Sequence, residues 1–424
     1  MSRIAVVGTG YVGLTTGAYL AHLGHDVVCA DILPEKVEQL SRGEIPIVEA
    51  GLEGLVKEGL AAGRLSFVLG SAAAAKESEF VFLCVPTPQG EDGAADLSYV
   101  ERAAREIAPV LRSQSVVINK STVPVGSTRV VERALGREDV FVVSNPEFLR
   151  EGSAVHDCLH PDRIVIGSDD QAAAIRVASL FDQIQAPLIV TDPASAETIK
   201  YASNAFLAAK VSFVNAIANL CESVGADVRE VILGMGYDRR IGFEFLKPGP
   251  GWGGSCFPKD SRALVKIADD VGYDFGLLKG VIQVNEDQYS RVAAKIDRLA
   301  GGAAGRTIGV WGLTFKARTD DLRDSPSLAV IRLLLGRGAR VQAFDPTVHR
   351  SLDLDGLEIT ADPYAACAGA SALAVLTEWD EFRWLDFDKV KELMAEPAVV
   401  DARNLLDPAP LRRRGFVYEG IGRV

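Results

Sequence analysis

The feature that most constrains the fold lies at the start of the chain, where a short apolar run meets a pattern of glycines. Ile4–Val7 is followed at once by Gly8-Thr-Gly10-Tyr-Val-Gly13. An apolar run of this kind predicts a buried parallel strand, and the apolar stretch that continues to Leu23 predicts a helix. Val27–Ala30 predicts a second strand, which closes on the acid Asp31. Strand, turn, helix, strand and acid in this order predict a dinucleotide-binding fold.

Each glycine of the pattern has a separate physical role. Gly8 makes the tight turn, Gly10 lets the backbone approach a pyrophosphate, and Gly13 lets the helix pack closely on the strand. The pyrophosphate would rest on the helix N-terminus, where backbone N–H groups have no other partner. Asp31 lies 18 residues after Gly13, near the spacing of a carboxylate that binds ribose hydroxyls. Because this carboxylate repels a 2′-phosphate, we expect NAD rather than NADP.

Length and composition narrow the class of protein. A chain of 424 residues is too long for one ordinary core, so two or three domains are expected. An apolar share of 48% and a charged share of 24% are typical of a soluble globular protein. The formal charge of −12 argues against a nucleic acid or an anionic membrane as a general partner. We expect no signal peptide and no uninterrupted apolar segment of membrane length.

The cysteines point to a reduced environment. All 6 are scattered along the chain, with no Cys-x-x-Cys pair and no segment rich in His. This pattern predicts neither a disulfide framework nor a structural zinc site, and we expect no bound metal. A cytoplasmic location fits best.

The order of expected elements predicts an α/β protein with two doubly wound domains. Residues 1–195 read as a Rossmann domain that binds NAD, and residues 301–424 as a smaller Rossmann-like domain. Between them, 196–300 reads as a central helical domain, with one long helix over Glu197–Val224 and more helix at 226–235 and 258–300. The expected strands are Ile4–Val7, Val27–Ala30, Phe80–Val85, Ser115–Asn119, Phe141–Ser144, Arg163–Gly167 and Leu188–Val190 in the first domain, and Thr307–Gly312, Arg340–Phe344, Ala372–Leu376 and Ala398–Val400 in the last.

The run Gly253-Gly-Ser-Cys-Phe-Pro-Lys-Asp260 is typical of a nucleophile. Pro258 suits the first turn of a helix, which would place Cys256 at the N-terminus, where the helix dipole favours the thiolate. Lys259 adds positive charge, and Asp260 lies one helical turn after the cysteine. The alternative is a buried structural cysteine, since cysteine is among the most buried residue types.

Several polar residues follow the ends of expected strands, where ligands bind in parallel sheets. Thr87, Thr122 and Glu147 occupy such positions. Thr122 would lie beside the cofactor or cap the following helix. Glu147 and Glu151 would polarise water if burial raises the pKa of either carboxyl group, or would be solvated surface groups.

Basic residues form the other candidate sites. Lys200 and Asn204 lie four residues apart on one helical face, aimed at a reacting oxygen or simply solvated. Lys316 and Arg318 follow the first strand of the last domain, where they would meet phosphates. Arg240 and Lys247 flank a loop rich in Gly and Pro, where they would bind an anion or face solvent.

Taken together, these motifs resemble the UDP-glucose 6-dehydrogenase family, and the match runs essentially from end to end. It rests on the glycine run at 8–13, Ser-Thr-Val-Pro at 121–124, Asn-Pro-Glu-Phe-Leu-Arg-Glu-Gly at 145–152, Lys200 with Asn204, the octapeptide at 253–260, and Phe315-Lys316 with Asp321. His160-Pro-Asp-Arg-Ile-Val165 is similar to the UDP-glucose branch rather than to relatives that act on GDP-mannose or UDP-N-acetylhexosamines. Trp252 stands where relatives often have Tyr or Phe, so an aromatic residue is kept.

The resemblance implies NAD-dependent oxidation of the C6 alcohol of UDP-glucose to UDP-glucuronate. Cys256 would capture the C6 aldehyde as a thiohemiacetal, which a second oxidation converts to a thioester that water hydrolyses. Asp260 and Lys200 would handle the alcohol proton and the developing oxyanion with help from Asn204, and Glu147 would assist hydrolysis, with Thr122 in the proton path.

The resemblance also implies the binding residues and a homodimer or larger homo-oligomer. NAD would contact Gly8, Gly10, Tyr11, Val12, Gly13, Asp31, Lys36, Thr87, Thr122, Glu151 and Lys259. The nucleotide sugar would contact Phe148, Leu149, Arg150, Lys200, Asn204, Phe245, Leu246, Lys247, Gly253, Phe315, Lys316 and Arg403. Arg240 would reach the sugar site of a partner subunit.

Two other classes of protein share part of this pattern. A β-hydroxyacid dehydrogenase also pairs a Rossmann domain with a helix bearing Lys-x3-Asn, but it needs neither a thiol nor a second nucleotide domain. A non-catalytic NAD-responsive protein would keep the glycine pattern without the set of Cys256, Lys200 and Asp260.

Overall fold

The computed structural model describes residues 1–90 and 94–423. It divides into two compact units, which we describe separately. The first unit comprises Met1–Ser203 and Arg262–Gly272, and the second comprises Asn204–Ser261 and Tyr273–Val424.

The first unit is built on one sheet. Its strands are β1 (Arg3–Val7), β2 (Asp26–Asp31), β3 (Leu65–Leu69), β4 (Phe80–Leu83), β5 (Val116–Asn119), β6 (Phe141–Ser144), β7 (Ile164–Gly167) and β8 (Leu188–Thr191). Their order is β3-β2-β1-β4-β5-β6-β7-β8. Neighbours run parallel except β6 and β7, which meet antiparallel at Ser144 and Gly167. The expected strands of this domain are confirmed, and β3 is an edge strand that the sequence analysis did not predict.

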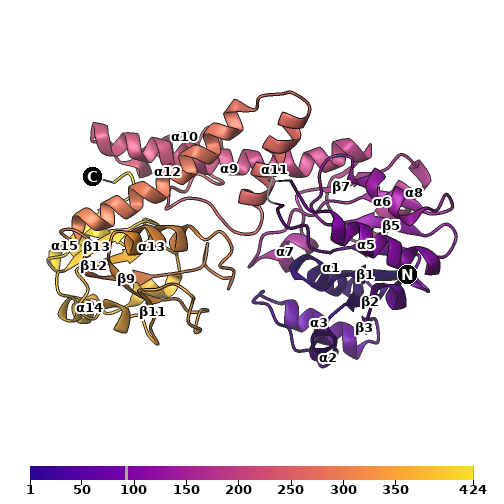
Figure 1. The fold of residues 1–424 in the computed structure, drawn as a ribbon, viewed down its shortest axis with the longest axis horizontal. Coiled ribbons are helices and arrows are strands. Elements are labelled where there is room, and N and C mark those ends of the chain that lie inside the picture. The colour runs from indigo at the N-terminus through magenta and orange to yellow at the C-terminus, as the bar shows by residue number, and fades with distance from the viewer. Residues whose placement is uncertain (91–93, 424) are drawn as a thin grey trace. The chain divides into compact units, whose positions relative to one another are not determined.

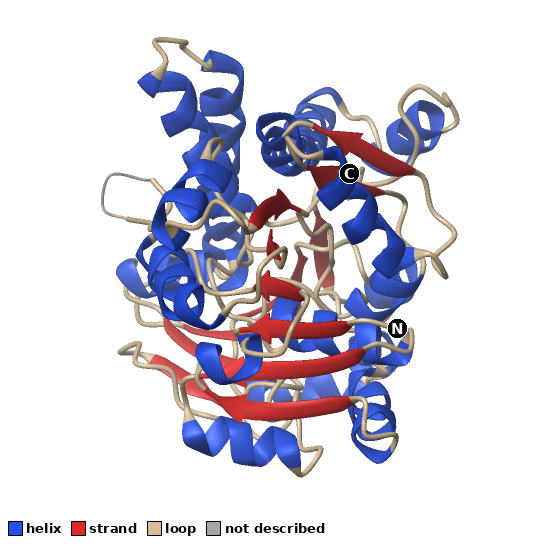
Figure 2. Cartoon of the chain, turned by 90° about the vertical axis from the view of Figure 1, so that its right-hand side faces the viewer, coloured by secondary structure: helices blue, strands red, loops and turns tan. Residues whose placement is uncertain are grey.

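Helices cover both faces of this sheet (Figure 2). They are α1 (Tyr11–His22), α2 (Pro34–Ser41), α3 (Leu52–Ala61), α4 (Ser71–Ala75), α5 (Ser98–Ile107), α6 (Ser127–Leu135), α7 (Ala154–Leu159) and α8 (Gln171–Ala178), with short 3-10 turns at Ala108–Val110 and Ser179–Phe181. One apolar cluster joins the sheet to α1, α3, α7 and α8, and another joins it to α4, α5 and α6. The sheet is therefore buried on both faces, which explains its runs of Val and Ile.

Four helices follow β8 along the chain (Figure 1): α9 (Pro193–Val224), α10 (Val228–Gly236), α11 (Phe257–Asp270) and α12 (Gly276–Leu299). Helices α9 and α11 each contribute residues to both units. The expected long helix is confirmed, although it starts at Pro193 rather than Glu197. The expected helix over 258–300 is wrong as a single element, because the chain breaks between α11 and α12, where Gly272 has a φ of +74°.

One helix has the length and composition of a membrane span, although it is not an uninterrupted apolar segment. Among the described residues, α9 is long and apolar enough to cross a membrane by length and composition, with a mean hydropathy of 1.2 over 18 residues. Within the protein, 44% of that window is buried. A core helix of a globular protein has the same signature, and polar side chains such as Lys200, Asn204 and Asn215 are buried along α9.

The second unit contains a smaller parallel sheet. Its strands are β9 (Thr307–Trp311), β10 (Arg340–Phe344), β11 (Leu357–Ile359), β12 (Ala372–Val375), β13 (Ala398–Asp401) and β14 (Val417–Gly420). The order β11-β10-β9-β12-β13-β14 repeats that of the first six strands of the other sheet. Its further helices are α13 (Pro326–Gly336), α14 (Phe387–Leu393) and α15 (Pro408–Arg413), with 3-10 turns at Ala365–Cys367 and Asp380–Trp384. The short strands β11 and β14 lie at the edges and were not predicted.

The strand order locates the ligand-binding positions. In each sheet the chain first adds strands on one side of the first strand and then crosses to add the later strands on its other side. This reversal lies between β1 and β4 in the first sheet and between β9 and β12 in the second. Ligands of such sheets bind outside the carboxyl ends of the strands at this switch point. The loops after β1, β4, β9 and β12 are therefore the first places to look for a site.

Candidate functional site

The glycine turn after β1 has the geometry of a phosphate-binding loop. Gly8 has a φ of +94°, and a Cβ there would lie 2.6 Å from the carbonyl oxygen of Cys84. A Cβ on Gly13 would collide with the carbonyl of Gly8, whereas a Cβ on Gly10 would meet nothing within 4 Å. Gly10 caps α1 without a side-chain hydrogen bond, and the first turn of α1 carries no acid. The N-terminus of α1 can therefore accept an anionic group.

Asp31 lies at the carboxyl end of β2 and faces this turn. Its carboxylate accepts hydrogen bonds from the backbone N–H and hydroxyl of Thr9 and from Lys36 Nζ at 3.1 Å. Burial raises the pKa of Asp31, but the bonds from Thr9 and Lys36 outweigh it, so the pKa lies below its ordinary value. The side chain keeps 10% of its surface exposed. An ionised, accessible carboxylate at this position suits a ribose diol.

Tyr11 and Thr87, which were also predicted to bind the cofactor, lie in the first unit, whereas Lys259 lies on α11 in the second. Tyr11 contacts the Glu49 carboxylate and accepts a hydrogen bond from Gly152 N at 2.8 Å. Thr87 donates to the Thr122 carbonyl at 2.8 Å, which links the loops after β4 and β5. Helix α6 begins at Ser127 with Gly126 as its N-cap, so Thr122 does not cap it.

Glu147 and Lys200 form a buried ion pair within the first unit. Lys200 Nζ lies 2.7 Å from Glu147 Oε1, and the two side chains are 4% and 5% exposed. The Leu149 backbone N–H donates to the other carboxylate oxygen at 2.7 Å. Burial raises the pKa of Glu147, but these partners together with the charge of Lys120 outweigh it and hold the pKa below its ordinary value. The condition of a pKa raised by burial is therefore not met at Glu147, because a cation is buried with the carboxylate.

The residues after Glu147 place charge around one aromatic ring. The Arg163 guanidinium lies 3.6 Å from the centre of the Phe148 ring, and Lys200 Nζ lies 5.6 Å from it. Arg150 forms an ion pair with Asp157 at 2.5 Å, and half of its side chain stays exposed. Phe148 is thus held by two cations through its π face.

Cys256 lies at the N-terminus of α11 in the second unit, as its sequence predicts, since the helix begins at Phe257. Its Sγ is 3.5 Å from Ser255 Oγ, and its carbonyl accepts the Asp260 N–H at 2.8 Å. The residue is partly exposed, unlike the other five cysteines, which are buried. A partly exposed thiol at a helix N-terminus is the environment of a reactive cysteine.

One turn into α11, Asp260 is fully buried and doubly paired. Its carboxylate accepts hydrogen bonds from Asn204 Nδ2 at 2.6 Å and from Lys259 Nζ at 2.7 Å. Asn204 is on α9 and Lys259 on α11, so the carboxylate links the two helices. The sequence spacing predicted a carboxylate near the thiol but not these two partners.

The loop before Cys256 is shaped by glycines. A Cβ on Gly253 would collide with the Asp324 carbonyl, and one on Gly254 would lie 2.8 Å from the Phe315 ring. Lys316 Nζ lies 5.2 Å from the centre of that same ring. Leu246 is buried and Lys247 is exposed, while the ring of Phe245 lies 6.1 Å from that of Phe257. Gly254 and Phe315 are thus brought together within the second unit.

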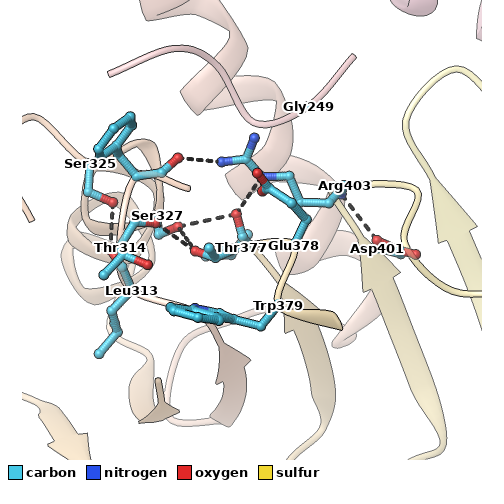
Figure 3. Close-up of polar contacts among 12 residues, drawn as sticks. Gly249, Leu313, Thr314, Ser325, Ser327, Thr377, Glu378, Trp379, Asp401 and Arg403 are labelled. Atoms are coloured by element: carbon cyan, nitrogen blue, oxygen red, sulfur yellow. Dashed lines mark hydrogen bonds and ion pairs between the residues drawn. The ribbon is translucent and has the colours of Figure 1, made fainter. Parts of the chain in front are cut away.

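Arg403 is fixed at the carboxyl edge of the second sheet, as Figure 3 shows. Its Nε donates to the Leu376 carbonyl and its Nη2 to the Phe315 carbonyl, each at 2.8 Å. Glu378 Oε2 lies 3.0 Å from Nε, which makes an ion pair. A Cβ on Gly249 would lie 3.3 Å from Nη1, so this end of the guanidinium borders the Gly-rich loop.

Arg240 lies apart from these groups. Its side chain is 89% exposed and pairs with Asp238 two residues earlier at 2.6 Å. Nothing in the chain itself brings Arg240 to a predicted site residue within the described part of the second unit.

The sequence analysis missed several polar residues at the carboxyl ends of the strands. Lys120 is buried and donates to Asn145 Oδ1 at 3.0 Å. Asp345 at the end of β10 is fully buried, and Glu378 follows β12. Each comes within a few residues of an expected strand end, so the rule applied to Thr87 and Glu147 could have found them.

Models of one family match the chain in three consecutive parts. The NAD binding domain of the UDP-glucose/GDP-mannose dehydrogenase family matches residues 2–185, its central domain matches 194–287, and its UDP binding domain matches 309–408.

Individual relatives match over the full length. A UDP-glucose 6-dehydrogenase from Rhizobium meliloti is 48% identical over 434 residues, covering 99% of this chain and 99% of the relative. A UDP-glucose dehydrogenase structure from Pyrobaculum islandicum has a TM-score of 0.93 and 39% identity, covering 100% of this chain and 98% of its own. A UDP-D-ManNAc dehydrogenase structure from Pyrococcus horikoshii has a TM-score of 0.88 and 30% identity, covering 99% of each chain. The glycine turn, the thiol at the start of α11 and these three matched domains together place the chain in the UDP-glucose/GDP-mannose dehydrogenase family.

Proposed function

We propose that this chain is an NAD-dependent enzyme that oxidises the C6 alcohol of UDP-glucose to the carboxylate of UDP-glucuronate. The observation that carries the proposal is Cys256 at the N-terminus of α11, in a chain of this family. A dehydrogenase that stops at an aldehyde or ketone needs no thiol. Oxidation from aldehyde to acid gains from covalent capture, which a thiolate provides.

The cofactor site is supported by the open N-terminus of α1 and by the ionised Asp31. NAD, when bound, accepts the hydride in each of the two oxidations. The groups that we expect to hold it are Gly8, Gly10, Tyr11, Val12, Gly13, Asp31, Lys36, Thr87, Thr122, Glu151 and Lys259. Because Lys36 already pairs with Asp31, it also neutralises part of that charge.

The thiolate of Cys256 forms the covalent intermediates. Its sulfur bonds to C6 of the aldehyde and gives a thiohemiacetal, which loses a hydride and a proton to become a thioester. The oxygen of a water molecule then bonds to the carbonyl carbon, the C–S bond breaks, and Cys256 leaves as the thiolate. The helix dipole at the start of α11 stabilises that thiolate both as nucleophile and as leaving group.

The neighbouring polar groups move protons and stabilise charge. Asp260 accepts the proton of the alcohol, and Lys200 and Asn204 stabilise the oxyanion. Glu147 receives the proton of the attacking water, with Thr122 in the path. The lowered pKa of Glu147 supports this last role, because the carboxylate is ionised and ready to accept a proton at neutral pH.

The nucleotide sugar is bound through both charge and shape. The fixed guanidinium of Arg403 and the ammonium of Lys316 suit a diphosphate, and the loop up to Gly253 offers backbone groups. The expected contacts are Phe148, Leu149, Arg150, Lys200, Asn204, Phe245, Leu246, Lys247, Gly253, Phe315, Lys316 and Arg403. We assign 1–195 to NAD binding, 196–300 to the central helical domain and 301–424 to binding of the UDP-sugar.

The stoichiometry of the reaction tests the proposal. We expect two NADH per UDP-glucose and no free aldehyde, because both oxidations take place on one captured substrate. Cys256→Ala should lower acid formation by at least about 10⁴-fold while NAD and UDP-glucose still bind, since the thiol contributes a bond rather than affinity. One NADH per sugar with aldehyde in solution, or full turnover by Cys256→Ala, would contradict the thioester route.

Other nucleotide sugars remain the second candidate, because the family also includes enzymes named for GDP-mannose and a UDP-D-ManNAc dehydrogenase. We propose UDP-glucose, since the full-length relative with 48% identity is named for it. Turnover with UDP-glucose, GDP-mannose and UDP-N-acetylmannosamine side by side decides between them, and a higher kcat/KM for either of the latter two would reassign the substrate.

The proposal includes a homodimer built on α9. Within the second unit, Phe206, Phe213 and Leu220 are 67%, 52% and 55% exposed. Their spacing of two helical turns puts them in one apolar stripe, which a second copy of the chain would cover. Exposed Arg240 would then reach the sugar site of the partner.

Complementation between two inactive variants tests the dimer. In a mixture of Cys256→Ala and Arg240→Ala chains, about half of the dimers are mixed, and each mixed dimer has one site with both residues intact. We therefore expect about a quarter of the sites to work. If Arg240 serves its own subunit, the mixture will be as inactive as the separate variants.

We also propose a cytoplasmic location, with neither nucleic acid nor membrane as a partner. The formal charge of −12 and the six free cysteines support it. Fractionation of cells that produce the full chain tests it, and recovery with the membrane fraction would contradict it.

A further inference from the structure

One buried lysine has no role in the mechanism proposed above. Lys120 follows β5 and is 7% exposed. Its Nζ donates to the neutral amide oxygen of Asn145 at 3.0 Å, and no ion pair joins it to a carboxylate among residues 1–90 and 94–423. Burial of an ammonium without a direct counterion is costly. A charge kept at such a cost, next to a candidate site, indicates a function.

The contacts of Lys120 tie it to the segment that carries Glu147. The Lys120 backbone N–H donates to the Leu83 carbonyl at 3.1 Å, which fixes the lysine to the end of β4. Asn145, which accepts the ammonium, donates its own amide to the Val165 carbonyl at 2.8 Å. Asn145 stands two residues before Glu147, so the ammonium and the Val165 carbonyl together fix the start of the turn that presents the carboxylate.

Lys120 and Glu147 also line one polar cavity of about 140 Å³ inside the first unit. The other charged or titratable residues that line it are Tyr19, Arg150, His156, Asp157, Cys158, His160, Asp162 and Arg163. A cavity of this size with polar walls holds ordered water. Lys120 and Glu147 therefore border the same cavity.

The charges around Lys120 identify the group on which it acts. Cys84, Cys158 and Glu147 lie near the ammonium, as does Lys200 from α9. Burial raises the pKa of the Cys84 thiol to about 12 and that of the Cys158 thiol to about 12, so both are neutral at physiological pH. Glu147 is the remaining anion. In turn, Lys120 is one of the two cations that lower the pKa of Glu147.

We propose that Lys120 is a positioning residue for Glu147, fixing the Asn145–Glu147 turn and supplying a second positive charge beside the carboxylate. The inference rests on the proposed role of Glu147 as the group that receives the proton of the attacking water. That proton can be taken only by the ionised carboxylate. Burial lowers the pKa of Lys120 itself, and wherever the lysine keeps its proton, its charge extends the pH range over which Glu147 is ionised.

The direction of the pH effect follows from the sign of the charge. Without Lys120, the ionised form of Glu147 is less stable, so its pKa rises and hydrolysis is lost at a higher pH on the acid side. At high pH, Glu147 is ionised in either case, and the rate there is kept. A merely structural lysine would instead lower the rate by the same factor at every pH.

The experiment compares Lys120→Met, which removes the charge but keeps the length, with Lys120→Arg, which keeps the charge. Hydrolysis is followed in the full enzyme by acid quench and intact-protein mass spectrometry, which measures the fraction of Cys256 carrying a sugar adduct between pH 5 and pH 9. We expect the acid limb of hydrolysis to move up by about half to one pH unit in Lys120→Met and to stay in place in Lys120→Arg. Cys158→Ala, which alters the same cavity without a change of charge, serves as the matched control and should behave as the wild type.

A second variant covers the case in which Lys120→Met does not fold. Asn145→Asp gives the ammonium a direct counterion and cancels its charge near Glu147, so the acid limb should again move up. An unmoved limb in every variant that folds, with a uniform loss of rate, would overturn the inference. A wild-type enzyme that never carries a sugar adduct on Cys256 would instead overturn the proposed function itself.

Discussion

At the end of its first strand, each parallel sheet turns on a glycine with nearly the same conformation: φ is +94° at Gly8 and +93° at Gly312. Gly8 N donates to the Ala30 carbonyl, and Gly312 N to the Phe344 carbonyl, both at 2.8 Å. Each bond reaches the neighbouring second strand. The two sheets thus share their strand order and the way in which the chain leaves the first strand.

The two sheets differ in the path of the chain beyond this glycine. After Gly8, the helix begins at Tyr11, so its N-terminus lies at the switch point. After Gly312, the helix begins only at Pro326, and a long loop over 313–325 fills the space between. The dipole of α13 is therefore separated from the turn, whereas that of α1 is adjacent to it.

The acids at the ends of β2 and β10 also differ, because only the acid of the first sheet is accessible. Asp31 keeps part of its surface exposed. Asp345 is fully buried, and its oxygens accept the backbone N–H groups of Leu313, Thr314 and Thr347 and the indole N–H of Trp379. Asp345 therefore stabilises the loop that follows β9 and leaves no space for a ribose beside its carboxylate. A shared strand order and glycine turn therefore do not define the ligand; the start of the helix and the accessibility of the acid do.

The largest effect that we expect from this comparison is on stability. Asp345→Ala leaves several buried N–H groups without an acceptor and should lower the free energy of unfolding by about 3 kcal/mol. Asp31→Ala, at the equivalent position of the first sheet, should cost about 1 kcal/mol or less, since water can replace the lost partner. Urea unfolding of both variants measures the difference. An equal decrease in the free energy of unfolding would show that the two acids contribute equally to stability.

A smaller effect distinguishes the two acids by coenzyme preference. Asp31→Ala should shift the NAD-to-NADP ratio of kcat/KM toward NADP by roughly 10- to 100-fold, because it removes two possible ribose hydrogen bonds and the repulsion of the 2′-phosphate. Asp345→Ala is the matched control, in which any folded enzyme should keep the wild-type ratio. If the ratio is unchanged in Asp31→Ala, the carboxylate does not face the ribose.

The smallest expected effect concerns Gly10, whose Cβ position is open. Gly10→Ala should leave the free energy of unfolding within about 0.5 kcal/mol of the wild type. It should weaken NAD binding by about tenfold, because the methyl group occupies the approach of the pyrophosphate. Gly54→Ala, which also points into open space but on α3, is the control for titration calorimetry with NAD. An unchanged Kd for NAD in Gly10→Ala would contradict the proposal that the pyrophosphate binds at this turn.

The sequence predicted the parts of this molecule that depend on local pattern. The strands around the glycine turn are continuous apolar runs, and Pro258 indicated where α11 starts. The edge strands β3, β11 and β14 were missed because each lies beside only one neighbour and mixes buried or half-buried residues with exposed ones, which interrupts the continuous apolar run of a central strand. Gly272 indicated a break between α11 and α12. The apolar residues at helical spacing on both sides of it nevertheless favoured one continuous helix.

The paired charges of the candidate site could be predicted only in part. Cys256 and Asp260 lie one turn apart, so their spacing identified them. Glu147 and Lys200 are 53 residues apart, and their contact depends on the strand order that brings the end of β6 to α9. The sign of the pKa shift of Glu147 depends on that contact, so no local pattern could have given it.

The single antiparallel pair in the first sheet has a consequence for engineering. Because β7 runs against β6, the chain leaves one strand and enters the next at the same edge of the sheet. Residues 145–163 thus need no crossover and form a connection, which includes the short helix α7, between Ser144 at the end of β6 and Ile164 at the start of β7. This connection holds Glu147, Phe148 and Arg163. Exchanging it for the matching segment of a relative that acts on another sugar would test whether it sets the proposed substrate choice, while β6 and β7 keep their partners.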